Sequence, residues 1–211
     1  MKPRKLAKAM AFACGWVVVS PLVLLAWLEE KISDKESVFV SLGQLLSLIP
    51  GKVGSFLRAA YYFGTLEACS WEVHIGFGSF FSHRSARLGS HVSMGSYCII
   101  GTATIDSGVM MASRVSIPSG KRQHFDDNGN ISSTPRFERV TIGNNTWIGE
   151  GVIVLADVGA DSILSAGAVI VNRIPSQQLA AGNPAKPIRS LAQTASPADS
   201  CGSCLDPACP V

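Results

Sequence analysis

The sequence predicts an all-β solenoid, a column of short parallel strands, and two columns of residues carry this prediction. An aliphatic residue recurs every six positions, usually before a small one, as in Leu88-Gly89, Met94-Gly95 and Ile100-Gly101. Four residues beyond each aliphatic position stands a small or β-branched residue, such as Val92, Cys98 or Thr104. Each six-residue unit is therefore interpreted as a strand and a corner, and three units as one coil. A barrel or sandwich would instead show period-two alternation.

The solenoid is expected over residues 73–176, with four to five coils stacked at about 4.8 Å each. The aliphatic side chain of each unit should point into the prism, and the small residue should allow a tight corner. The six-residue period stops after Ile117 and resumes at Ile142, so the stretch 118–139 is predicted to leave the column as a loop.

The N-terminal part, residues 1–35, is predicted to be a membrane-anchoring apolar helix. Residues 9–28 carry no charge, and a helix of that length covers about 30 Å, the hydrocarbon thickness of a bilayer. Basic residues precede it, which favours a cytoplasmic N-terminus. A signal peptide is the competing interpretation, but Glu29, Glu30 and Lys31 follow the run where a cleavage site would stand.

Residues 36–72 are expected to form an amphipathic helical leader with a second apolar stretch at 38–57. One simple crossing by the first helix would place everything downstream outside the cytoplasm. A bend at Pro21 with re-entry, or a second segment that returns or lies in the interface, would keep the body inside.

Composition argues against nucleic-acid binding and against a metal site in the C-terminal segment. The net charge of +3 is too mild to indicate nucleic-acid binding, and no nucleic-acid motif is present. Residues 193–211 are rich in Ser, Pro, Ala and Gly and are expected to be disordered. Cys201, Cys204 and Cys209 lie there without the fourth ligand that zinc usually takes, so no metal is predicted.

The stretch "VTIGNNTWIGEGVIVLADVGADSILSAGAVIVNRIPSQQLAAGNPAKPIR", residues 140–189, resembles the hexapeptide-repeat acyltransferases. It is most similar to maltose and galactoside O-acetyltransferases and to sugar O-acetyltransferases of polysaccharide gene clusters. The leader "GQLLSLIPGKVGSFLRAAYY" also resembles the polysaccharide type. The resemblance implies a left-handed parallel β-helix, a homotrimer and acetyl-CoA as cosubstrate. It further implies a saccharide or lipid-linked saccharide acceptor in exopolysaccharide, capsule or lipopolysaccharide biosynthesis, at the cytoplasmic face of a bacterial inner membrane.

In that family a loop carries a histidine into a cleft between subunits, and His124 is the only histidine of the loop 118–139. A sugar hydroxyl needs a base to take its proton as it attacks a thioester, and histidine, with an ordinary pKa of about 6.5, suits this task. The resemblance thus makes His124 the general base of a direct transfer. Asp126 or Asp127 could orient the imidazole, and Asp126 and His83 are candidate acceptor-binding residues.

Five positions match the coenzyme side of the family pattern: Trp147, Gly149, Ala166, Lys186 and Arg189. Trp147 would offer an apolar wall to the pantetheine arm and Gly149 would leave room for it. Lys186 and Arg189, in the predicted coenzyme-side segment 177–192, would meet phosphates. The chain departs from the pattern at 171–173, where Val-Asn-Arg replaces the usual Thr-Lys-Asp.

Two other functions remain open from the residues. A non-catalytic scaffold is favoured by the altered residues 171–173. A γ-type carbonic anhydrase would need three converging histidines, whereas His74, His83 and His91 are spaced nine and eight apart, out of step with the six-residue period.

Overall fold

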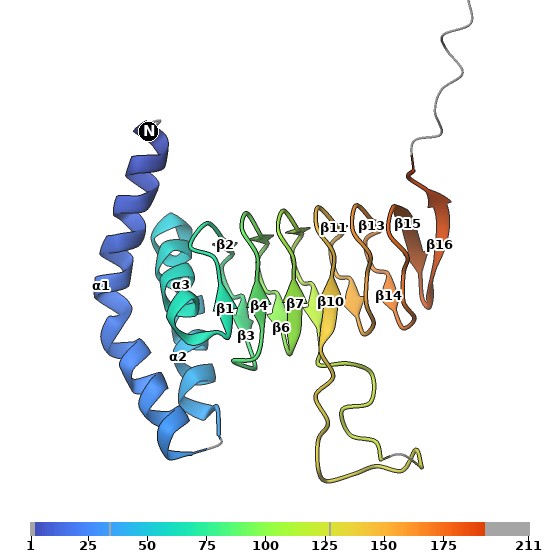
Figure 1. Cartoon of the computed structure of the whole chain (residues 1–211), viewed down its shortest axis with the longest axis horizontal. Coiled ribbons are helices and arrows are strands. Elements are labelled where there is room, and N and C mark those ends of the chain that lie inside the picture. The colour runs from blue at the N-terminus through green and yellow to red at the C-terminus, as the bar shows by residue number, and fades with distance from the viewer. Residues whose placement is uncertain (1–2, 34, 127, 193–211) are drawn as a thin grey trace, which may run out of the picture.

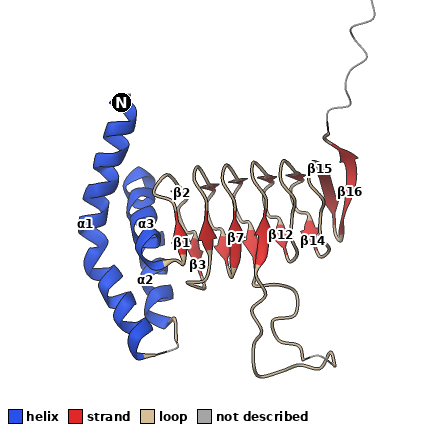
Figure 2. Ribbon diagram, in the orientation of Figure 1, coloured by secondary structure: helices blue, strands red, loops and turns tan. Residues whose placement is uncertain are grey.

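The computed structural model describes residues 3–33, 35–126 and 128–192. A layer of three helices comes first and lies across one end of a β-solenoid, and a long loop projects from the solenoid's side (Figures 1 and 2). The helices are α1 (Pro3–Ile32), α2 (Ser37–Ser47) and α3 (Gly51–Thr65). The all-β solenoid predicted from the six-residue period is confirmed.

Three parallel sheets form the sides of the prism, and the chain visits them in turn. The four-stranded sheet comprises β1 (Ala68–Cys69), β4 (Arg87–Leu88), β7 (Ala103–Ile105) and β10 (Val140–Ile142). The five-stranded sheet comprises β3 (Phe80–Phe81), β6 (Ile99–Ile100), β9 (Ser116–Ile117), β12 (Ile153–Val154) and β14 (Val169–Ile170). The seven-stranded sheet comprises β2 (His74–Ile75), β5 (Ser93–Met94), β8 (Met110–Met111), β11 (Trp147–Ile148), β13 (Ile163–Leu164), β15 (Gln178–Gly182) and β16 (Ala185–Ser190).

The predicted number of coils, four to five, was too small: the solenoid has about six. Six parallel strands of the seven-stranded sheet, β2, β5, β8, β11, β13 and β15, mark one coil each, while β16 pairs antiparallel at the end. The predicted range 73–176 already includes five of these strands, from β2 to β13. The range ends before the sixth strand, β15, where Ala180 takes the buried position that Leu164 fills in the neighbouring strand β13.

The core and the corners follow the two columns read from the sequence. The aliphatic position of each unit is buried, as for Ile75, Met94 and Ile148, each 0% exposed. Corner glycines lie against the backbone of the next coil. A Cβ on Gly143 would stand 2.4 Å from the nitrogen of Ala160, closer than real atoms approach. The absent side chain is therefore a condition for the coils to stack.

The helical layer closes the open end of the prism through a buried arginine. Arg58 of α3 is 1% exposed and donates to the carbonyls of Ile75 (3.0 Å), Leu46 (3.0 Å) and Ile49 (2.8 Å). These bonds join α3 to the end of α2 and to the first coil. α1 runs through Pro21 as one helix and packs along α3, so the re-entrant bend considered at Pro21 is not formed.

Candidate active site

The loop 118–139 leaves the prism between β9 and β10 and folds back on itself as an irregular hairpin (Figure 1). Phe125 and Ile131 form an antiparallel bridge at its tip. The amide of Ser132 donates to the carbonyl of His124 at 2.8 Å, and that of Arg136 to Gln123 at 2.8 Å. His124 thus lies on one arm of the hairpin with its backbone fixed and its side chain exposed.

Asp126 closes the turn of this hairpin. Its Oδ1 accepts hydrogen bonds from the amides of Asn128 (2.9 Å) and Asn130 (2.8 Å). The bond from the Asn130 amide, with smaller contributions from Asn128 and Gly129, lowers the pKa of Asp126 below its ordinary value. The carboxylate therefore serves the turn on which the His124 arm depends. Asp127, the other acid considered, lies outside the described residues.

His83 lies at the foot of the same loop. Its Nδ1 is 2.6 Å from Oε2 of Glu36, and its ring packs on that of Phe137 with centroids 4.2 Å apart. Burial raises the pKa of Glu36, but hydrogen bonds from His83 and from the Arg84 amide outweigh it and leave the pKa below its ordinary 4.5. Three segments distant in sequence meet here: the α1–α2 connection, the first coil and the stem of the loop.

The predicted coenzyme-side residues share one region of the solenoid. Trp147 faces outward from β11 with 41% of its surface exposed, beside Met110 in the neighbouring strand. β13, β15 and β16 follow β11 in order across the sheet, and Lys186 and Arg189 stand exposed on β16. Three strand spacings put about 15 Å between Trp147 and these two cations. An apolar wall followed by two cations suits an extended thiol arm that ends in phosphates.

Gly149 and Ala166 occupy successive corners of this region. A Cβ on Gly149 would meet the nitrogen of Ala166 at 2.6 Å and the oxygen of Leu164 at 2.8 Å. Coil stacking alone therefore accounts for the glycine, whatever lies along the outside of the corner.

One chain does not bring His124 and Trp147 together. The loop leaves from the edge where the five-stranded sheet (β9) gives way to the four-stranded sheet (β10). In a three-sided prism, that edge is opposite the seven-stranded sheet on which Trp147, Lys186 and Arg189 lie. The candidate base and the candidate coenzyme surface of a single chain thus face different directions.

The three histidines of the carbonic anhydrase hypothesis lie in separate contacts. His74 Nδ1 is 2.9 Å from the Ser55 hydroxyl, His83 meets Glu36, and His91 lies 3.6 Å from Glu72. Within residues 3–33, 35–126 and 128–192, no group of three or more His, Cys, Asp or Glu side chains could hold a metal ion.

The chain is similar in sequence to curated acetyltransferases over part of its length. Over 95 residues it is 36% identical to the galactoside O-acetyltransferase of Escherichia coli, covering 43% of this chain and 45% of that protein. The chain spans less than half the length of the curated relatives it matches first, between 26% and 45%. No family model matches the chain.

Solved structures show the same fold. A maltose O-acetyltransferase from Clostridium difficile superposes with a TM-score of 0.64 at 21% identity, covering 72% of this chain and 84% of that one. A hexapeptide-repeat acetyltransferase from Vibrio cholerae, complexed with acetyl coenzyme A, gives 0.63 at 19% identity, covering 76% and 91%. The resemblance to the hexapeptide-repeat acyltransferases is confirmed.

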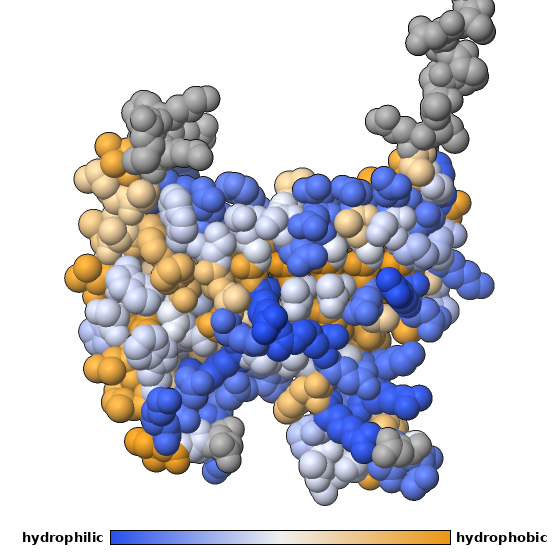
Figure 3. Space-filling view, viewed as in Figure 1, coloured by the Kyte–Doolittle hydropathy of each residue, from blue (hydrophilic) through white to orange (hydrophobic). Residues whose placement is uncertain are grey.

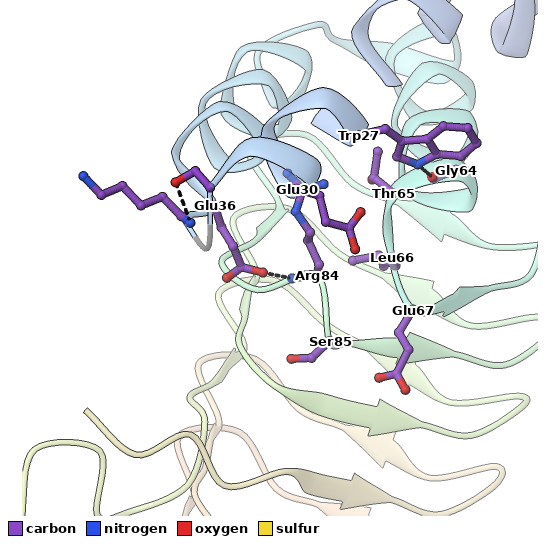
Figure 4. Close-up of a pocket in the computed structure, with 11 residues that line it drawn as sticks. Trp27, Glu30, Glu36, Gly64, Thr65, Leu66, Glu67, Arg84 and Ser85 are labelled. Carbon is purple, nitrogen blue, oxygen red and sulfur yellow. Dashed lines mark hydrogen bonds between the residues drawn. The ribbon is translucent and has the colours of Figure 1, made fainter. Parts of the chain in front are cut away.

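One feature of the chain was not predicted, a pocket where the helical layer meets the first coil (Figure 4). Its volume is about 590 Å³. Residues from three separate segments line it, including Trp27, Glu30, Glu36, Glu67 and Arg84. The one signal in the sequence was a tryptophan followed by two acids at the end of an apolar run.

Proposed function

We propose that the chain is an acetyl-CoA-dependent O-acetyltransferase that acts on a sugar hydroxyl, with His124 as general base. The hydroxyl oxygen would attack the thioester carbonyl carbon, forming the new C–O bond as the C–S bond breaks. The imidazole would take the hydroxyl proton and pass it to the departing thiolate. The observation that carries the proposal is the hairpin, which interrupts the repeat and presents the side chain of His124 on a fixed backbone. Named acetyltransferase relatives of the same fold support it.

The proposed site is built from two copies of the chain in a homotrimer. A single chain directs His124 away from its own coenzyme surface, so a neighbour would supply the other half. Exposed apolar side chains support this assembly: Ile131 (86%) and Phe125 (43%) on the loop, and Met110 (52%) and Ile99 (45%) on the sheets. Apolar side chains that are exposed in a single chain are typical of an interface between subunits.

Free-thiol release from acetyl-CoA across a panel of sugars tests the chemistry. His124→Ala should lower turnover roughly 10²- to 10⁴-fold, the usual contribution of a positioned base. His91→Ala, which removes an exposed histidine from a corner of the first coils, serves as the control and should keep normal turnover. Equal activity in the two variants would rule out His124 as the base. Wild-type protein inactive on every sugar would favour the non-catalytic scaffold.

We further propose that α1 lies in the plane of the membrane, with the solenoid on the cytoplasmic side. One helix, Leu6–Ile32, is long and apolar enough to span a bilayer. One of its faces is occupied, because Val19, Val23 and Ala26 are buried against α3. The opposite face exposes apolar residues such as Val17 (71%) and Leu24 (55%). Figure 3 shows hydrophobic surface along α1, at the left edge of the view.

A spanning orientation conflicts with these contacts. α3 also packs on the first coil, so an upright α1 would carry polar coil residues such as Arg87 into the hydrocarbon. An in-plane helix avoids this cost and keeps the site beside cytoplasmic acetyl-CoA. Protease added outside intact spheroplasts should cleave neither terminus nor the solenoid. Cleavage from outside would establish a crossing and contradict the proposal.

A further inference from the structure

We propose that the pocket between the end of α1 and the first coil binds a saccharide unit of the acceptor, an inference that rests on the proposed function. The pocket has three walls. Trp27, Glu30, Ser33, Lys35 and Glu36 come from the end of α1 and the α1–α2 connection. Residues 64–67 are the end of α3 and the two residues that lead to β1, and Arg84 and Ser85 come from the corner between β3 and β4. Figure 4 shows these segments around one hollow.

The lining chemistry favours a neutral, hydroxyl-rich ring. The indole N–H of Trp27 donates to the carbonyl of Gly64 at 2.7 Å, which fixes the ring while 49% of the residue stays exposed. An aromatic ring fixed in this way can pack against the C–H face of a sugar, and carboxylates accept hydrogen bonds from the sugar hydroxyl groups. Glu36 already meets His83, and Glu67 is paired with Arg87 and Arg139, so within the described residues Glu30 is the lining carboxylate left to accept from a ligand hydroxyl.

Arg84 gives the pocket a buried donor that the described part of the chain leaves unused. The residue is 9% exposed, and its Nη2 donates to Glu29 at 2.7 Å. Its Nη1 is buried and has no hydrogen-bond partner among the described residues. An unused buried donor costs free energy, and a hydroxyl oxygen brought in by a ligand would satisfy it.

The pocket also lies between the proposed membrane face and the loop. Leu28 and Ile32 of the same α1 turns are 48% and 82% exposed. Glu36 holds His83, which packs on Phe137, and Glu67 pairs with Arg139 at 2.6 Å, so two pocket acids also hold the stem of the loop. The α1–α2 connection and the loop project on the same side of the solenoid, with a notch between them (Figures 1 and 3). A sugar attached to a membrane lipid could reach this notch without leaving the bilayer surface.

Two measurements on the full chain test the pocket, one of which needs no turnover. Octyl β-glucoside, octyl β-galactoside and maltose are used as probes, with binding followed by saturation-transfer NMR. The test variant is Glu30→Gln, whose carboxylate makes no hydrogen bond among the described residues, so the fold should be unaffected. The matched control is Glu72→Gln, which removes the same charge from the first coil outside the pocket.

Glu30→Gln should weaken probe binding and raise the KM for the acceptor roughly tenfold, with kcat and the KM for acetyl-CoA within about twofold of wild type. Glu72→Gln should match wild type. Equal values in the two variants, or no binding of any probe to wild type, would overturn the proposal. Binding that Glu30→Gln weakens, without thiol release from wild type, would sustain the pocket and refute the transferase function.

Discussion

The stacked coils and the projecting loop differ in where their backbone hydrogen bonds go. A coil bonds to the next one, as the amide of Gly95 does to the carbonyl of Met111 at 2.9 Å. The loop bonds within itself, as Ser132 does to His124, or to its own stem, as Glu138 does to Ser119 at 3.0 Å. Each coil position is thus dictated by a neighbouring coil, whereas the loop can vary without disturbing the stack. Packing between coils therefore constrains the residue types of the solenoid, whereas the residues of the loop are free to be selected for function.

The largest effect is expected in a subunit complementation experiment, which tests whether the loop of one chain serves the coenzyme surface of another. His124→Ala and a Lys186→Glu/Arg189→Glu double variant should each be inactive alone. If the loop of one copy serves the coenzyme surface of another, co-expression in equal amounts should restore about one quarter of wild-type activity, because each site draws its halves independently. Thiol release from the purified mixture measures this. Co-expressed His124→Ala chains with two different tags provide the baseline, and a mixture no more active than this baseline would place the whole site in one chain.

Two glycine substitutions, one in the coils and one in the loop, compare how strongly each region depends on its glycine for the free energy of unfolding. Gly143→Ala would push a Cβ to 2.4 Å from the Ala160 backbone and should lower the free energy of unfolding by about 3 kcal/mol or more. Gly129→Ala, at the loop tip, meets nothing within 4 Å and adds only the strain of a φ of +82°, about 1 kcal/mol. Urea denaturation followed by circular dichroism measures both. Equal losses would show that the loop is as tightly determined as the coils.

The same contrast explains how much of the molecule the sequence could predict. The six-residue repeat records contacts between residues about one coil apart, so it predicts the solenoid and its corners. The gap in the repeat between Ile117 and Ile142 predicts where the loop leaves the solenoid. The junction of helices and first coil has no period. The contact of Glu36 with His83 and the salt bridge of Glu29 with Arg84 join residues 47 and 55 positions apart. No local pattern records such meetings, and the pocket they enclose was therefore not foreseen.

The smallest expected effect concerns the acid that links this junction to the loop. The folded-state pKa of Glu36 is depressed, so its contribution to stability is present above the ordinary carboxyl value and is lost as the pH falls through the folded value. Glu36→Gln should therefore be less stable than wild type at pH 6, by about 1 kcal/mol or less for a partly exposed pair. The difference should shrink towards zero at pH 3.

Urea unfolding at a series of pH values measures that difference, and Glu30→Gln provides the matched removal of a neighbouring charge. Other acids with depressed pKa values, such as Glu67 at about 2, lose their contributions in both proteins, so the comparison with wild type isolates Glu36. A gap that stays constant from pH 6 to pH 3 would mean that the carboxylate form of Glu36 does not hold His83. The loop stem would then rest on the Arg139–Glu67 pair and on packing alone, and the acid at position 36 would be a feature of the pocket rather than of the loop.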